Sequence, residues 1–406
     1  MKPKQLLEIT LGVFTSIGGF LEVGSMMTAA QAGADFGYQL LWAILLGTIC
    51  LASLIEMSGR FAAVSGHTIA DALRERFGLH FFIVPLVAMG VVSILLLAAE
   101  LGGMCAALQI ATAVAIRWWA MPAALLTWLL LWRGTFGMIE KGVSMLGLVT
   151  VVFGVAAIRL APDLSGVASG LVPSLPHEKA AHYWFLAVSI LGAAIAPAVF
   201  YFYSSGGVEE KWDESHVASN RIVAWGGITF GGILSGAVLI VAVLTLQARG
   251  ITIDHFDQAA LMLLDPLHRI GFWGFVASLF IASFSAALEV ALAIAYLIAQ
   301  GLGWNWGEDL KPRDDARFSV SYTVAIFVGA ILLVVGLDPL KLTLFTMALT
   351  SATLPIAVVP FLVLMNDDAY LGRYTNGYLS NAVVLFTVLV ACVLAVVSIP
   401  LELAGG

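Results

Sequence analysis

The chain has 406 residues, of which 61% are hydrophobic and only 11% are charged. An ordinary soluble domain carries about 25% charged residues, so this chain has too few charges to cover a soluble surface. The sequence is therefore that of an integral membrane protein, which excludes a soluble enzyme and a secreted disulfide scaffold. The net charge of −7 offers no basic face, so nucleic acid is excluded as a partner.

The N-terminus and the cysteines agree with a membrane-embedded chain. Residues 1–4 (MKPK) lead into a long apolar segment without a small-residue cleavage site, which predicts a retained first span and not a signal peptide. Cys50, Cys105 and Cys392 lie in apolar runs, at spacings that suit neither a zinc site nor a disulfide framework. We expect all three to serve packing.

A helix that crosses the bilayer needs about 20 mostly apolar residues. Eleven segments meet this requirement, and the connectors between them are too short to hold a soluble domain. In chain order, the predicted spans are 10–31, 38–58, 80–113, 116–132, 141–160, 182–204, 221–248, 270–302, 318–337, 341–366 and 377–400. The sequence thus predicts one all-α polytopic transmembrane domain over residues 1–406.

The connector charges predict the orientation of these spans. Lys and Arg gather on the cytoplasmic side of a membrane. With a cytoplasmic N-terminus, only six of the 19 basic residues face the other side, and 13 face the cytoplasm. The six are Arg117, Arg159, Lys179, Arg249, Arg269 and Lys341. We therefore expect a cell-membrane protein with its N-terminus inside and its C-terminus outside.

Two spans are interrupted near their middle. Span 1 contains the sequence EVGS at 22–25, and span 6 contains APA at 196–198. Pro197 lacks a backbone N–H, so the helical hydrogen bond cannot close there. Interrupted spans five apart are typical of inverted repeats, in which substrate binds at the midplane between the two breaks. We expect residues 1–160 and 182–366 to form the two repeats, with 377–400 as an additional span.

Four carboxyl groups lie within predicted spans, where an ionisable side chain marks a pathway or a site by default. Glu22 stands at the break in span 1, so it is the leading candidate for binding a cation. Glu100 in span 3, Glu289 in span 8 and Glu56 at the end of span 2 are candidates for carrying a proton or a coupling ion. Each of the four could instead be a hydrogen-bonded structural residue. None of the seven histidines falls at the centre of a span.

Several stretches resemble the NRAMP family (natural resistance-associated macrophage protein) of divalent metal transporters. The resemblance covers most of the chain and depends on the order and spacing of its motifs. The matching stretches are 22–25 (EVGS), 33–42 (GADFGYQLLW), 64–76 (VSGHTIADALRER), Glu100 with Gly103, Glu140-Lys141, 190–198 (ILGAAIAPA) and 354–357 (LPIA). The resemblance implies a LeuT-type inverted five-plus-five repeat with broken helices 1 and 6.

By this resemblance, the metal would be bound by Glu22, Ser25, the carbonyl of Ala196 and Met347. The departures from the family concern the same positions. Glu22 stands in place of an Asp, Ser25 in place of an Asn, and Met347 in place of a Gln. Ala196 replaces a Met thioether, and Ala198 replaces a His that is linked to proton movement. Loss of the soft thioether at 196 predicts a harder ion such as Mg²⁺.

We therefore predict a secondary active transporter that imports a divalent cation of the Mg²⁺ or Mn²⁺ type, with Glu100 leading the candidates for proton handling. We expect a monomer that needs no cofactor, performs no enzymatic reaction and takes metal, protons and lipid as its partners. One alternative keeps the fold but carries a small organic solute, coupled to H⁺ or Na⁺ through Glu22 or Glu289. A second alternative is a membrane scaffold that transports nothing.

Overall fold

The computed structural model describes residues 22–133, 148–174, 176, 179–307, 310, 312–313 and 315–403. Within these ranges every regular element is a helix, which confirms the all-α prediction. The first part of predicted span 1 (10–21) and the start of predicted span 5 (141–147) lie outside the described residues. Eight stretches of described helix are long and apolar enough to cross a membrane.

The main helices follow the predicted spans closely, although the exact number of eleven is not established. They are α2 (Val23–Phe36), α3 (Leu41–Ser65), α5 (Leu79–Thr112), α6 (Ile116–Arg133), α8 (Val151–Leu160), α10 (Ala180–Ala194), α11 (Pro197–Glu209), α12 (Val217–Thr245), α14 (Leu264–Leu302), α15 (Ala316–Val334), α16 (Pro339–Met365) and α18 (Tyr378–Leu403). The largest difference lies at α3, which runs seven residues beyond predicted span 2. α10 and α11 together correspond to predicted span 6.

Short helices that the sequence did not predict occupy the connectors. They are α4 (Ile69–Phe77), α9 (Leu164–Gly170), α13 (Phe256–Ala260) and α17 (Asp368–Leu371), with 3-10 turns at Gly37–Leu40, Leu148–Thr150, Glu214–His216, Gln247–Arg249, Leu261–Leu263 and Gly372–Tyr374. Local capping explains α4. Gly66 ends α3 in the left-handed conformation (φ 67°), and the Thr68 hydroxyl then accepts the Asp71 N–H at 3.2 Å.

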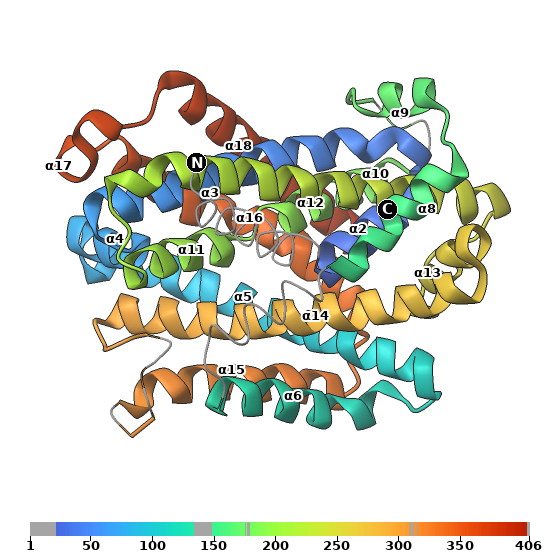
Figure 1. Cartoon of the computed structure of the whole chain (residues 1–406), viewed down its shortest axis with the longest axis horizontal. Helices are drawn as coiled ribbons and strands as arrows, with labels where there is room; N and C mark the ends of the chain where they lie inside the picture. The colour runs from blue at the N-terminus through green and yellow to red at the C-terminus, as the bar shows by residue number, and fades with distance from the viewer. Residues whose placement is uncertain are drawn as a thin grey trace.

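The long helices lie side by side in one bundle (Figure 1). α15 packs against α6 at one edge, and α14 and α5 lie next to them. α3, α12, α10 and α2 form the opposite side, with α16 and α18 against α10. α16 also packs against α5, so it connects the two sides. The start of α2 and the interruption between α10 and α11 are therefore enclosed by α5, α14 and α16.

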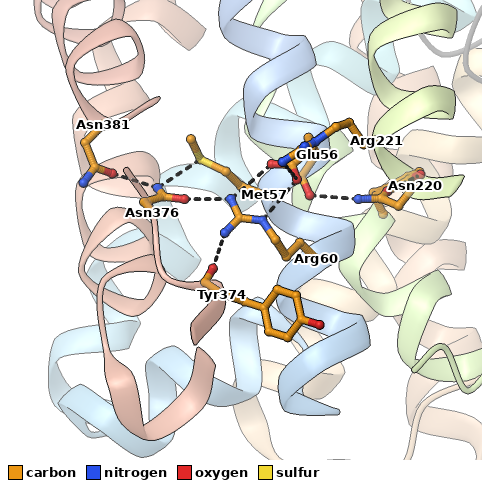
Figure 2. A network of polar contacts seen from close by, with 9 residues as sticks. Glu56, Met57, Arg60, Asn220, Arg221, Tyr374, Asn376 and Asn381 are labelled. Carbon is orange, nitrogen blue, oxygen red and sulfur yellow. Dashed lines mark hydrogen bonds and ion pairs between the residues drawn. The ribbon is translucent and has the colours of Figure 1, made fainter. Parts of the chain in front are cut away.

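A buried network of hydrogen bonds and an ion pair connects the C-terminal half of α3 to neighbouring segments (Figure 2). Arg60 donates to both Glu56 carboxylate oxygens at 3.1 Å, and also to the Tyr374 carbonyl and to the Asn376 side chain. The Asn220 amide donates to the Glu56 backbone carbonyl at 2.9 Å. Helix α3 is thereby joined to α12 and to the segment that precedes α18.

A histidine ties α10 to two other helices. Nε2 of His182 lies 3.1 Å from Asp35 on α2, and Nδ1 lies 2.9 Å from Glu402 on α18. The ring also packs on Phe36, with 5.7 Å between ring centroids. Helices α2 and α10 are therefore held together at the ends remote from Glu22 and Ala196.

We predict that Arg60→Ala destabilises the fold by about 3–5 kcal/mol, because it leaves the Glu56 carboxylate buried without its partner. Thermal unfolding in detergent measures this loss. Arg221→Ala is the matched control, since Arg221 is 68% exposed and lies 3.8 Å from the same carboxylate. Its loss should change stability by less than about 1 kcal/mol. Adding Glu56→Gln to Arg60→Ala should restore part of the stability; equal effects of the two Arg variants would contradict this account.

Candidate functional site

Glu22 marks the start of the helical part of span 1 in the described structure. Its backbone is extended (φ −94°, ψ 177°), and α2 begins at the next residue. The Glu22 N–H donates to the Ser25 hydroxyl, which in turn donates to the Glu22 carbonyl, both at 3.1 Å. Since the Ser25 hydroxyl already donates its proton to the backbone of Glu22, it could contact an ion only through its oxygen.

The second break separates α10 from α11. Ile195 and Ala196 leave the helical conformation (φ/ψ −117°/60° and −73°/117°), and Pro197 is the first residue of α11. Because Pro197 has no N–H, the Ala193 carbonyl cannot receive its helical hydrogen bond. The Ala196 carbonyl accepts the Val199 N–H at 3.1 Å, so it also keeps one free lone pair. The predicted interruption of span 6 is thus present.

Met347 on α16 lies against both breaks. A Cβ added at Gly24 would stand 2.0 Å from the Met347 methyl group and 2.7 Å from its sulfur. A Cβ added at Gly192, near the end of α10, would stand 1.8 Å from the Met347 carbonyl oxygen. Glu22 Oε1 lies 3.1 Å from the same Gly24 Cβ position. One residue of α16 therefore brings a thioether to the Glu22 carboxyl and lies between the two half-helices.

Glu22 and Glu100 bring two carboxyl groups together in the interior. Glu22 is 4% exposed and Glu100 is fully buried. The Glu100 carboxyl faces that of Glu22 and the backbone N–H of Val23. It also interacts electrostatically with Glu289. Yet neither Glu100 oxygen, nor Oε1 of Glu22, makes a well-formed hydrogen bond with any residue of the described ranges. Two buried carboxyls in contact need a proton or a cation between them.

The remaining candidates have different surroundings. Glu289 is half-buried on α14, and it interacts electrostatically with the Glu22–Glu100 pair through Glu100. Glu56 is paired with Arg60, which gives it a structural partner. In the described part of the chain, no group of three His, Cys, Asp or Glu side chains is arranged to hold a metal. Any cation at the breaks would need backbone, hydroxyl or thioether ligands besides its carboxylates.

Sequence reasoning missed two close approaches in this region. The contact of Gly192 with the Met347 backbone was not predicted, nor was the position of Ser283, whose buried hydroxyl lies beside Gly103. The only signal in the sequence was the presence of small residues at these places, which allow transmembrane helices to approach closely.

Comparison with known proteins agrees with this geometry. The model of a family described as natural resistance-associated macrophage protein-like matches residues 12–400. The chain belongs to the Nramp family. It is therefore a membrane transporter and not an enzyme, as the sequence predicted.

Solved structures confirm the fold. The chain is similar to the manganese transporter of Eremococcus coleocola, with 20% identity and a TM-score of 0.77 over 99% of this chain and 87% of that one. It is also similar to MHP1, a nucleobase-cation-symport-1 family transporter, with 14% identity and a TM-score of 0.60 over 97% and 91%. MhsT, solved with L-phenylalanine, gives 13% identity and 0.58 over 96% and 97%. These neighbours confirm the LeuT-type architecture.

We predict that Gly24→Ala folds and costs less than about 1 kcal/mol, because the obstructing atoms are the flexible end of Met347. Gly192→Ala is the matched contrast. Its Cβ would collide with the backbone of α16, which cannot move aside, so we expect a loss of more than about 3 kcal/mol. Unfolding temperatures of the two variants in detergent measure the difference. Similar stabilities would contradict the placement of α16 between the breaks.

Proposed function

We propose that this protein imports a divalent metal cation, which binds between the two breaks. The observation that carries the proposal is the Glu22–Glu100 pair, in which two buried carboxyl groups face each other and three of their oxygens have no hydrogen-bond partner among the described residues. A divalent cation would neutralise both carboxylates at once, and it would supply the partner that the described residues do not provide. Membership of the Nramp family supports the same class of substrate.

The available ligands are mainly oxygens. Glu22 offers a carboxylate, Ser25 a hydroxyl oxygen, and the end of α10 offers backbone carbonyls with no helical partner. Oxygen ligands suit Mg²⁺ and Mn²⁺, and Mg²⁺ keeps several of its waters. The backbone N–H of Val23, in the first turn of α2, faces the Glu100 carboxyl, which would stabilise that carboxylate before the ion arrives.

The Met347 thioether makes the site less selective for hard ions than the loss of the thioether at Ala196 predicted. Ala196 removes the thioether from α11, but the Met347 sulfur reaches the same region from α16. Thioether sulfur favours softer transition ions. We therefore propose a site of the Mg²⁺ or Mn²⁺ type in which Met347 lets softer ions compete. The Eremococcus coleocola neighbour is a manganese transporter, which supports this range.

Proton coupling is proposed to run through Glu100. Glu100 is buried and contacts the proposed ion ligand Glu22. The histidine that the family uses for proton movement is replaced by Ala198 on α11, so it cannot take this role here. When the cation leaves, a proton can take its place between the two carboxyls. Glu289, half-buried and electrostatically linked to Glu100, would be the next group to receive it.

The first test is metal binding to the purified protein in detergent. Glu22→Gln should abolish calorimetric binding of Mg²⁺, Mn²⁺ and Cd²⁺, because it removes a formal charge from the site. Met347→Ala is the matched variant at the same place. It should keep Mg²⁺ binding and weaken Cd²⁺ binding by about tenfold, since one soft ligand is lost.

Two results would count against the proposal. Metal binding that survives Glu22→Gln would exclude the break as the metal site. A wild-type protein that binds no divalent ion, but is stabilised by organic solutes, would favour an organic-solute transporter with the same fold.

The second test concerns the proton. In proteoliposomes, an inward proton gradient should accelerate metal uptake by the wild type, and Glu100→Gln should remove this response because its amide cannot take up the proton. Glu56→Gln is the control, since Glu56 is paired with Arg60 and should keep the response. A gradient response that persists in Glu100→Gln would exclude Glu100 as the coupling residue.

A further inference from the structure

Ser283 on α14 has an unusual hydroxyl. Buried Ser and Thr side chains in this bundle commonly donate to the backbone carbonyl one turn earlier, as Thr48, Ser189 and Thr343 do. Ser283 is fully buried, yet its hydroxyl has no hydrogen-bond partner within the described residues. An unsatisfied hydroxyl in the interior costs about 1–3 kcal/mol, so a partner that is not part of the protein would stabilise it.

A close contact between helices shows where this hydroxyl lies. A Cβ added at Gly103 on α5 would stand 2.2 Å from the Ser283 oxygen and 2.9 Å from a methyl group of Val23. Ser283 therefore lies where α5, α14 and the first residue of α2 meet. Any larger residue at 103 would occupy the space that the hydroxyl uses.

The same corner contains the unsatisfied carboxyl. Gly103 follows Glu100 by three residues, so the two lie on one face of α5, about one turn apart. Glu100 faces Glu22 and the N–H of Val23, which is also the residue beside Ser283. Four buried oxygens that have no hydrogen-bond partner in the described part of the chain thus lie near the beginning of α2, on three helix segments.

From this arrangement we infer that Ser283 is an additional oxygen ligand of the cation held by Glu22 and Glu100. The inference rests on the proposed function and adds α14 to the ion site. It also explains how the site obtains a hydroxyl, because that of Ser25 is engaged with the backbone of Glu22. A neutral oxygen ligand stabilises hard ions such as Mg²⁺ and Mn²⁺ more than it stabilises Cd²⁺.

Calorimetric titration of Mg²⁺, Mn²⁺ and Cd²⁺ into purified variants tests this inference. Ser283→Ala should weaken Mg²⁺ and Mn²⁺ binding by about tenfold and Cd²⁺ binding by less, because an oxygen ligand is lost. Ser283→Cys keeps the size of the side chain but offers sulfur, so it should reverse the preference toward Cd²⁺. Ser285→Ala is the matched control, since that hydroxyl donates to the Ala282 carbonyl at 2.9 Å, and its affinities should stay at the wild-type values.

The outcomes separate this inference from the proposed function. A wild type that binds no divalent ion overturns both. A wild type that binds divalent ions while Ser283→Ala and Ser283→Cys bind all three with unchanged affinity overturns the role of Ser283 alone. If Ser283→Ala unfolds during purification, the near-isosteric Ser283→Cys decides, because only an ion ligand would shift the ratio of Cd²⁺ to Mg²⁺ affinity.

Discussion

The contact between Glu22 and Glu100 is the constraint on which the rest of the site depends. Two carboxyl groups in a membrane interior repel each other and have lost their water, so they are stable only with a compensating positive charge. The protein supplies part of it through the N-terminal N–H groups of α2, which Glu22 precedes and Glu100 faces. In the proposed mechanism, the remainder arrives as a proton or a metal ion, and the site exchanges one for the other.

The surrounding helices reach this contact because the chain places glycines where they meet. Gly24 admits the Met347 side chain, Gly192 admits the Met347 backbone, and Gly103 admits the Ser283 hydroxyl. Without a hydrophobic driving force between helices in lipid, such close packing supplies much of the association energy. The same glycines therefore hold the bundle together and let the Met347 sulfur and the Ser283 hydroxyl approach the carboxyl pair.

Much of this architecture could be predicted from the sequence, because length and apolar composition determine which segments cross a bilayer. The interruption at Pro197 was predictable because proline lacks an N–H, and Glu22 because an acid within a span is costly. The Arg60–Glu56 pair has helical i, i+4 spacing but was not singled out. The approaches of Met347 and Ser283 could not be derived, since they depend on how helices distant in sequence pack. The short connector helix α4 follows from caps at Gly66 and Thr68 that hydropathy does not detect.

Anomalous diffraction from crystals grown with Mn²⁺ would test the central claim most directly. The account predicts one strong Mn²⁺ peak bounded by the carboxyls of Glu22 and Glu100 and the side chains of Met347 and Ser283. The peak should be absent in crystals of the Glu22→Gln variant grown under the same conditions. No peak in the wild type, or a peak elsewhere in the bundle with the two breaks unoccupied, would contradict the account.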